Sequence, residues 1–284
     1  MARTAMVTGA AMGMGAMMAR KLAQRGWTVF AGILPGADTA ELAGGGAGLT
    51  PIEQDVTDEA MVQAGARQVA QVLRGAGLDL LINNAGIADI ATGPVEGVEL
   101  EQAGRLFDVN LFGQVRVIKA YLPLLLESRH APRIFNFSSG AVRVPMPCAA
   151  MYNSSKYAVE GLTNTLRYEL ARFGVQVTAI EPGAVRTHMT ADPVRATARI
   201  WERSSAAIRQ RYEAKLRPIT DQLGRLLLSA NEPDYVTDAV LRLVEAPRLR
   251  PRYLVGREVR MLPLLQALLT ESAFERLIAR QFHL

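Results

Sequence analysis

The chain has 284 residues, 49% of them hydrophobic and 21% charged, and it carries a net charge of +5. This composition fits a soluble globular protein with a sizeable core, and it excludes the disordered and fibrous classes of protein. The one cysteine, Cys148, excludes an intramolecular disulfide. A single cysteine and the lack of a recognisable signal peptide predict a cytoplasmic protein. No apolar run reaches the roughly 18 residues of a membrane-spanning helix, so we expect no membrane span.

Short apolar runs alternate with longer segments of helical periodicity, which is typical of strand–helix units around a parallel sheet. We therefore predict a single α/β domain over residues 1–284: a Rossmann-like, doubly wound, mostly parallel sheet of about seven strands with helices on both faces. The expected strands are Thr4–Val7, Thr28–Gly32, Leu49–Glu53, Leu78–Asn83, Arg133–Ser138, Val175–Glu181 and Arg252–Val255. The expected helices are Met14–Arg25, Glu59–Arg74, Glu101–Leu126, Tyr152–Phe173 and one around Val236–Glu245.

Three glycines, Gly9, Gly13 and Gly15, follow the first expected strand and open the first expected helix. Glycine lets the backbone turn tightly and approach a pyrophosphate, and a helix N-terminus supplies N–H groups and positive partial charge. The placement between a strand and a helix predicts a phosphate-binding loop, in which Met12 and Met14 stand between the glycines.

The end of the second strand bears on which dinucleotide would bind. In many dinucleotide-binding folds an acidic residue about 20 positions after the glycines holds the adenosine ribose. The strand here ends at Ile33 and Leu34 without an acid, and neither this corner nor Met12 offers a cation for a 2′-phosphate. Because an unpaired phosphate is costly to desolvate, we favour NAD(H) and keep NADP(H) as the alternative. Asp38 follows a few residues late and is interpreted as part of the loop.

Polar residues also follow the third and fourth expected strands. Asp55 and Val56 close the third strand, where Asp55 either caps the next helix or contacts an adenine ring. The run Asn83-Asn84-Ala85-Gly86 follows the fourth strand, and such small and amide residues suit a backbone that lies near a cofactor. Neither segment identifies a binding site by itself.

Tyr152 and Lys156 stand four residues apart on an expected helix, so their side chains share one face about one turn apart. A nearby cation favours phenolate over phenol, so we expect Lys156 to lower the pKa of Tyr152. Such a pair suits proton exchange with an alcohol or a ketone. The spacing alone is common on solvated helices and gains meaning only from the other motifs.

In their order along the chain, these motifs resemble the short-chain dehydrogenase/reductase family in its single-domain form. The resemblance covers about residues 4–190. Its motifs are Thr8-Gly9-x-x-x-Gly13-x-Gly15, Asp55-Val56, Asn83-Asn84-Ala85-Gly86, Asn110, Ser138-Ser139, Tyr152-x-x-x-Lys156 and Pro182-Gly183. Each motif is loose, but a coincidence of all of them in this order is very improbable.

The resemblance implies a catalytic set. Tyr152 would be the acid/base, and Lys156 would lower its pKa and hold the nicotinamide ribose. The family's gap of thirteen residues before the tyrosine selects Ser139 for the substrate, which leaves Ser138 to satisfy a strand end. Asn110 resembles the asparagine that kinks its helix and supports a proton-relay water near the lysine.

The resemblance also implies the cofactor contacts. The loop after the sixth strand looks like the one whose Val185 backbone and Thr187 side chain orient the nicotinamide carboxamide. The implied set is Gly9, Met12, Gly13, Met14, Gly15, Ile33, Asp55, Val56, Asn83, Ala85, Gly86, Tyr152, Lys156, Pro182, Gly183, Val185 and Thr187.

Four further segments resemble the branch of the family that holds retinol, 17β-hydroxysteroid and type-1 3-hydroxybutyrate dehydrogenases. They are Phe30-Ala31-Gly32-Ile33-Leu34, Pro123-Leu124-Leu125, Leu166-Arg167-Tyr168-Glu169 and Glu181-Pro182-Gly183. We favour a hydrophobic alcohol or ketone, with Val144, Met151 and Met189 as candidate contacts. The alternative is a small hydroxy acid, whose carboxylate would meet Arg143 or Arg186. The alternative of another class is a nucleotide-sensing protein without catalysis, against which the complete proton-transfer set speaks.

The remaining segments carry further expectations. Residues 188–230 fall where the family places a lid over the substrate. Residues 257–284 form an amphipathic segment with one expected helix from Leu262 to Ile278, which docks on its own domain, on a second subunit or, as the minor alternative, on a membrane surface. The long helices predict a homodimer or homotetramer, as the family commonly forms. Basic residues are dispersed and no metal-ligand spacing occurs, so we expect neither a nucleic-acid partner nor a metal.

Overall fold

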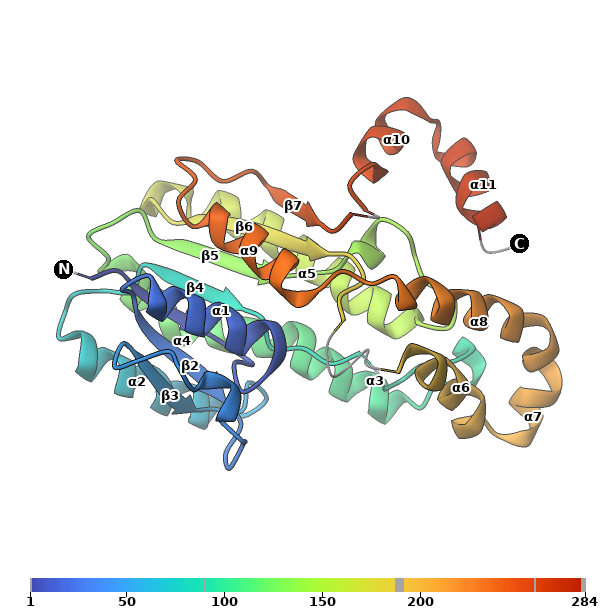
Figure 1. Cartoon of the computed structure of the whole chain (residues 1–284), viewed down its shortest axis with the longest axis horizontal. Coiled ribbons are helices and arrows are strands. Elements are labelled where there is room, and N and C mark those ends of the chain that lie inside the picture. The colour runs from blue at the N-terminus through green and yellow to red at the C-terminus, as the bar shows by residue number, and fades with distance from the viewer. Residues whose placement is uncertain (1, 89, 187–191, 258, 282–284) are drawn as a thin grey trace.

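A seven-stranded parallel sheet forms the centre of the protein, with the strand order β3-β2-β1-β4-β5-β6-β7 (Figure 1). The computed structural model describes residues 2–88, 90–186, 192–257 and 259–281. The strands are β1 (Thr4–Val7), β2 (Thr28–Ile33), β3 (Leu49–Glu53), β4 (Leu80–Asn83), β5 (Arg133–Phe137), β6 (Gln176–Pro182) and β7 (Arg252–Val255). The predicted fold class and strands are confirmed, with ends within two residues of those expected.

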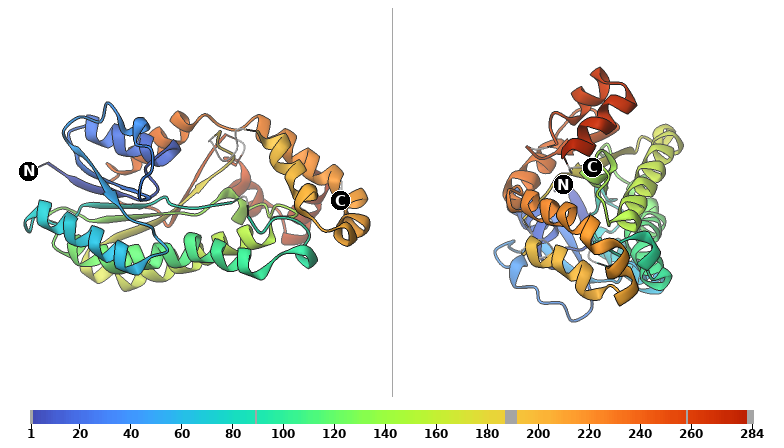
Figure 2. Two further views of the ribbon diagram at one scale, coloured as in Figure 1. Left: turned by 90° about the horizontal axis from the view of Figure 1, so that it is seen from below. Right: turned by 90° about the vertical axis from the view of Figure 1, so that its right-hand side faces the viewer.

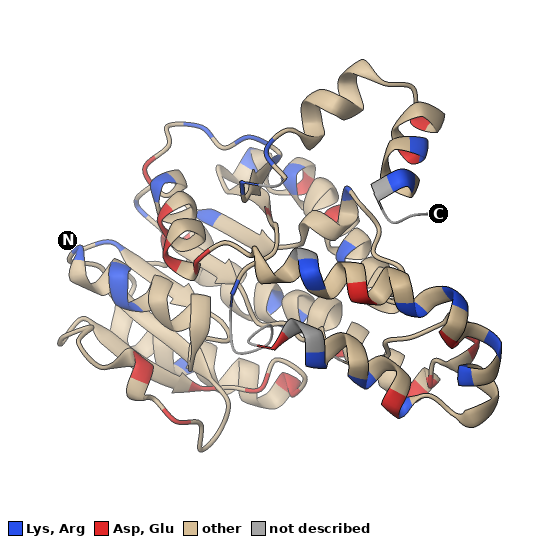
Figure 3. Cartoon of the chain, turned by 45° about the vertical axis from the view of Figure 1, so that its right-hand side comes forward, with Lys and Arg blue, Asp and Glu red and all other residues tan. Residues whose placement is uncertain are grey.

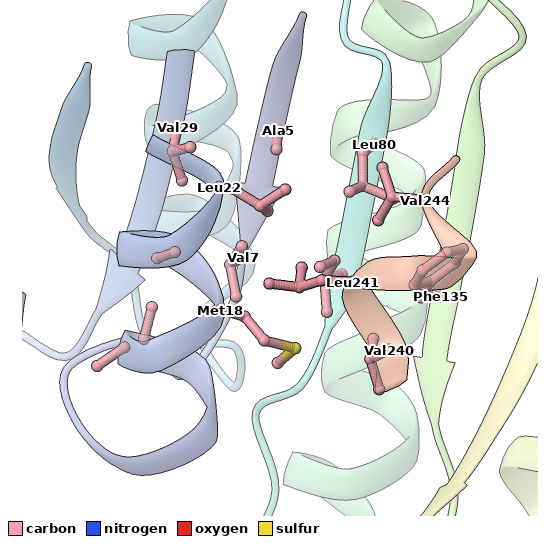
Figure 4. Close-up of a cluster of buried hydrophobic side chains, with 14 of the residues drawn as sticks. Ala5, Val7, Met18, Leu22, Val29, Leu80, Phe135, Val240, Leu241 and Val244 are labelled. Atoms are coloured by element: carbon pink, nitrogen blue, oxygen red, sulfur yellow. The ribbon is translucent and has the colours of Figure 1, made fainter. Parts of the chain in front are cut away.

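Helices cover both faces of the sheet. Helices α1 (Gly13–Gln24) and α9 (Pro233–Leu243) lie on one face, and α2 (Glu59–Leu73), α4 (Gly113–Leu126) and α5 (Ala150–Glu169) lie on the other (Figure 2). Successive strand residues point to opposite faces, so Ala5 and Val7 of β1 join one apolar cluster while Met6 joins the other. In Figure 4, Met18 and Leu22 of α1 share an apolar cluster with Leu241 of α9 and with Val244, which directly follows α9.

The helix expected over Glu101–Leu126 is not a uniform α-helix. It consists of α3 (Leu100–Phe107), a π-helical turn over Asp108–Phe112, and α4. The whole stretch Leu100–Leu126 is long and apolar enough to span a membrane by length and composition. Half of its most apolar 18-residue window is buried in the molecule, as expected for a core helix that packs on a sheet. The length and composition of this stretch are therefore only weak support for a membrane span.

A helical insertion stands between β6 and α9, beyond the carboxyl ends of the strands (Figures 1 and 2). Its elements are α6 (Pro193–Arg203), α7 (Ala206–Ile208), a π-helical turn over Arg209–Glu213, and α8 (Ala214–Leu228). The indole Nε1 of buried Trp201 donates to Thr220 Oγ1 at 3.1 Å, which joins α6 to α8. Lys and Arg outnumber Asp and Glu along these helices (Figure 3). The expected helical character is confirmed, and the role of a lid stays a prediction.

The two ends of the insertion meet at its base. Val185 and Asn231 form an isolated parallel bridge. The Asn231 side chain donates to the Ala184 carbonyl at 2.9 Å, and the Arg257 N–H donates to the Asn231 side-chain oxygen at 3.1 Å. Asn231 therefore ties together the start of the insertion, its end and the chain that leads into the C-terminal segment.

The C-terminal segment forms two short helices, α10 (Leu262–Leu268) and α11 (Glu271–Gln281), where one amphipathic helix was expected. The pair stands away from the sheet (Figure 1). Met261, Leu264 and Leu268 are half or more exposed. Its contact with a second subunit or a membrane surface stays a prediction.

Candidate active site

A cavity of about 330 Å³ lies at the carboxyl ends of the central strands. It lies where the strand order reverses, because the chain passes from β1 to β2 and β3 on one side of β1 and then crosses to β4 on the other side. Ligands of doubly wound sheets bind at such a crevice. It is lined by Gly9, Met12, Gly13, Met14, Gly15, Asn84, Ala85, Gly86, Ile87, Ala88, Phe137, Ser138, Ser139, Tyr152, Lys156, Pro182, Gly183 and Val185. The cavity thus joins the predicted phosphate loop to the predicted catalytic residues.

The phosphate loop requires glycine for close packing. A Cβ on Gly15 would lie 2.1 Å from the carbonyl oxygen of Gly9, so a side chain there would force the loop apart. Gly13 has a φ of +60°, and a Cβ on it would meet nothing within 4 Å, so open space lies before it. Asn84 Nδ2 donates to the carbonyls of Thr8 and Gly9 at 3.0 and 3.1 Å. This bare backbone at a helix N-terminus fits the pyrophosphate of a dinucleotide.

The catalytic candidates lie at the other end of the cavity. Lys156 is 5% exposed, its Nζ donates to the Phe137 carbonyl at 3.0 Å, and the same Nζ lies 5.8 Å from the centre of the Tyr152 ring. Ser139 follows β5, lines the cavity beside Tyr152, and accepts a hydrogen bond from the Ala141 N–H through its Oγ at 3.1 Å. Ser138 is buried and donates to the Lys156 carbonyl at 3.2 Å. The structure brings Ser139, Tyr152 and Lys156 together.

Asn110 lies in the π-helical turn, fully buried. Its Nδ2 donates to the Ile87 carbonyl at 2.9 Å and to Ser155 Oγ at 3.1 Å, while its Oδ1 accepts from the Ile87 N–H at 2.8 Å. A Cβ on Gly86 would lie 3.3 Å from Asn110 Oδ1 and 3.5 Å from Lys156 Nζ. Asn110 and Lys156 therefore approach each other across Gly86, next to the cavity. The helix is locally widened at Asn110, as the resemblance implies; the water stays a prediction.

Burial controls the proton affinities here. It raises the pKa of the Tyr152 phenol, and the nearby Ser139 hydroxyl, which favours the phenolate, acts in the opposite direction. Burial also lowers the pKa of the Lys156 ammonium from 10.5 to about 8. The expectation that Lys156 brings the pKa of Tyr152 below its usual value is wrong for this state of the protein, because the loss of water around the phenol outweighs its neighbours.

The pKa of Lys156 predicts how stability depends on pH. Between pH 8 and 10.5 the folded chain has released a proton that the unfolded chain still binds, so stability should rise with pH. Across this window we expect the wild type to gain about 2–4 kcal/mol relative to Lys156→Met in free energy of unfolding, measured by urea denaturation. Lys119→Met, at an exposed lysine, is the control and should follow the wild type. Parallel pH curves for the wild type and Lys156→Met would contradict the prediction.

Several predicted contacts lie away from the lining of this cavity in the described part of the chain. Asn83 points into the sheet, where its Nδ2 donates to Asn136 Oδ1 at 2.9 Å. Asp55 accepts from the N–H and hydroxyl of Thr57, and Asp58 caps α2. Ile33 and Val56 are buried. Thr187 and Met189 lie outside the described residues.

The sequence prediction did not select Asn84, Ile87, Ala88 or Phe137 as cavity residues. The signal for Asn84 was present in the doubled asparagine, because successive strand residues point to opposite faces. One of the two therefore faces the sheet interior and the other the loop, but the sequence does not say which. Phe137 contributes through its backbone carbonyl, which any residue type would provide.

An apolar cluster adjoins Tyr152. Ala91, Ala103 and Leu106 are buried there, and Ile87, Ile90, Val98, Phe107, Met151 and Tyr152 pack against them. Of the candidate substrate contacts, Met151 belongs to this cluster, and Val144 is half-buried in the loop after Ser139. No group of three or more His, Cys, Asp or Glu side chains suited to a metal occurs among the residues that the structure describes.

Comparison with known proteins identifies the family. Residues 3–197 match the model of the short chain dehydrogenases. Retinol dehydrogenase 16 of Homo sapiens is 33% identical over 263 residues, which cover 90% of this chain and 81% of that protein. Estradiol 17-beta-dehydrogenase 2 of Rattus norvegicus is 34% identical over 193 residues, which cover 66% of this chain and 49% of that protein.

Solved structures agree with this. A short chain dehydrogenase of Burkholderia cenocepacia in complex with NADP is 25% identical, with a TM-score of 0.73 and 97% coverage of each chain. The 3-ketoacyl-(acyl-carrier-protein) reductase of Brucella melitensis, complexed with NADH, is 25% identical with a TM-score of 0.70, covering 89% of this chain and 95% of that one. This chain therefore belongs to the short-chain dehydrogenase family of nicotinamide-dependent oxidoreductases.

Proposed function

We propose that the protein interconverts a hydrophobic secondary alcohol and its ketone, with NAD(H) as the preferred cofactor. The observation that carries this proposal is the cavity lined by both Ser139 and Tyr152, in which Tyr152 lies between the glycine-rich phosphate loop and an apolar cluster. Family membership supports the reaction class, and the retinol and estradiol dehydrogenases among its relatives support the hydrophobic substrate.

The chain's own groups supply the proton and the geometry. Tyr152 holds a proton on its phenol because burial raises its pKa, so it is ready to donate to a ketone oxygen and to take the proton back from an alcohol. Ser139 orients that oxygen through its hydroxyl, and Lys156, fixed by the Phe137 carbonyl, stabilises the phenolate that forms. When bound, the nicotinamide supplies or accepts the hydride.

The arginines near the site argue against a small hydroxy acid. Arg143 donates through Nε and Nη2 to both oxygens of Glu181, at 2.7 and 2.5 Å. Glu181 is fully buried, so Arg143 would have to abandon a buried carboxylate in order to bind a substrate carboxylate. Arg186 is exposed and paired with Glu232 at 3.2 Å. The described arginines thus leave the apolar cluster beside Tyr152 as the stronger determinant of the substrate.

Kinetics on a matched panel of substrates tests this proposal. We expect the value of kcat/KM for steroid-like and polyprenoid-like alcohols to exceed that for 3-hydroxybutyrate by about 100-fold or more, because each buried methylene contributes about 0.8 kcal/mol to binding. Absorbance of the reduced nicotinamide at saturating NAD⁺ and NADP⁺ gives the rates. A preference for the hydroxy acid would overturn the proposed substrate class but leave the reaction class standing.

The same proposal includes a homodimer or homotetramer formed through α4 and α5. Large apolar side chains stand exposed along these helices and beside them: Phe112, Leu126, Tyr157, Tyr168 and Phe173, with Tyr168 81% and Phe173 64% exposed. An interface over this face would remove them from water. Sedimentation equilibrium of the wild type and of Tyr168→Glu, which places a charge on this face, tests it.

A further inference from the structure

Glu41 brings a carboxylate to the phosphate loop from an unexpected place. It lies in the 3₁₀ turn Ala40–Leu42, in the connection between β2 and β3 and eight residues after Ile33 ends β2. The backbone N–H of Gly13, the first residue of α1, donates to Glu41 Oε2 at 2.8 Å. The acid that is missing from the end of β2 is therefore supplied by the loop that follows it.

The position of Glu41 is set by packing on α1 and by the core. Leu42, the next residue, is 6% exposed and belongs to the apolar cluster under α1. Arg20 of α1 donates through Nη1 to the main-chain carbonyl of Glu41 at 2.9 Å. Asp38 is used differently, because its carboxylate accepts from the Ala40 N–H within the loop itself. These contacts hold the Glu41 backbone against the first helix.

Glu41 borders the cavity without filling it. It is not among the described residues that line the cavity, whereas Met12, Gly13 and Gly15 are. The space in front of Gly13, where a Cβ would meet nothing within 4 Å, is therefore left open for the pyrophosphate. In dinucleotide-binding folds the acid that binds the adenosine ribose stands about 20 residues after the glycines, which here corresponds to the end of β2, one of the two neighbours of β1. Glu41 stands on that side.

We propose that Glu41 accepts hydrogen bonds from the adenosine ribose hydroxyls and thereby selects NAD(H) over NADP(H). A carboxylate only accepts hydrogen bonds, so it suits a ribose diol, and it repels the negative charge of a 2′-phosphate. Met12 in the phosphate loop and Leu34 just after β2 carry no charge, and Arg20 donates to the main-chain carbonyl of Glu41. The inference rests on the proposed function and names the residue that sets its cofactor preference.

Direct binding titrations test this role without turnover. The wild type, Glu41→Gln and the control Asp38→Asn are titrated with NADH and with NADPH, and bound cofactor is followed by nicotinamide fluorescence. Glu41→Gln should weaken NADH binding about 10-fold and tighten NADPH binding about 10-fold, because it loses a charged acceptor and a repulsive charge. Asp38→Asn removes the same charge from the same loop and should leave the ratio of the two dissociation constants unchanged.

Each other outcome overturns the assignment in a distinguishable way. If Glu41→Gln tightens both cofactors equally, the carboxylate only competes with the pyrophosphate for the start of α1. An unchanged ratio of dissociation constants, with tight binding retained, removes Glu41 from cofactor selection but leaves the proposed function intact. A wild type that binds neither dinucleotide overturns the proposed function itself. Circular dichroism and thermal unfolding of each variant show whether the fold is kept.

Discussion

Tyr152→Phe should lower kcat about 10³-fold and change the affinity for NADH much less. The substitution removes the phenol that gives a proton to the substrate oxygen, and a positioned general acid contributes about 10²–10⁴-fold to a rate. The ring still packs against the apolar cluster beside α5, so we expect the fold to be retained. Initial rates at saturating substrate and a cofactor titration measure the two quantities separately.

Tyr157→Phe is the matched control for this experiment. Tyr157 lies on α5 five residues further along, is 48% exposed and belongs to the face proposed for oligomer contact, outside the described lining of the cavity. Removal of the Tyr157 hydroxyl in Tyr157→Phe should leave kcat unchanged. If Tyr152→Phe retained wild-type turnover, the acid/base role would be refuted. If the wild type bound NADH but reduced no carbonyl compound, the non-catalytic nucleotide sensor would be favoured.

Arg143→Met should destabilise the protein by about 3–5 kcal/mol, since it leaves the buried carboxylate of Glu181 without its partner. Few groups nearby can compensate. Arg252 Nε lies 3.9 Å from Glu160 and 4.0 Å from Glu181, and Glu160 is itself a buried acid whose pKa is raised by burial and by Glu181. The melting temperature should fall by about 6–20 °C, which differential scanning fluorimetry measures.

Two further variants separate the buried pair from a general effect of losing an arginine. Arg186→Met breaks the exposed pair with Glu232, in which both side chains are more than half exposed, and should cost about 0–1 kcal/mol. The double variant Arg143→Met/Glu181→Leu removes both charges and should recover much of the lost stability. An Arg143→Met melting temperature equal to that of Arg186→Met would show that Glu181 needs no partner.

The central strands β1, β4 and β5 could be predicted from the sequence because each is a short, largely apolar run that is buried on both faces. Leu80, Leu81 and Ile82 of β4 follow one another and are all completely buried, so this strand appears in the sequence as an unbroken apolar run. The phosphate loop was predictable for a related reason, since a glycine at position 15 is imposed by a backbone contact 2.1 Å from its missing Cβ. Local steric requirements of this kind restrict which residue types can occupy a position, so they can be read from the sequence.

Features that depend on contacts between distant parts of the chain could not be predicted from the sequence in the same way. The pKa of Tyr152 follows from how much water its neighbours exclude, which the spacing to Lys156 does not contain. Glu41 contacts Gly13, twenty-eight positions away, and only the folding of its loop onto α1 makes that contact. The C-terminal segment shows helical periodicity, but Thr270 lies between two helices and the pattern did not predict the break.

The bridge between Val185 and Asn231 has a consequence for how this enzyme can be changed. Because the chain leaves and re-enters the sheet region at one hydrogen-bonded point, the segment between these residues is a loop with fixed ends. The entropy of closing such a loop grows only by about 0.6 kcal/mol for each doubling of its length. We therefore expect that helices α6 to α8 can be exchanged between relatives as one unit without unfolding the sheet, provided that Asn231 is retained.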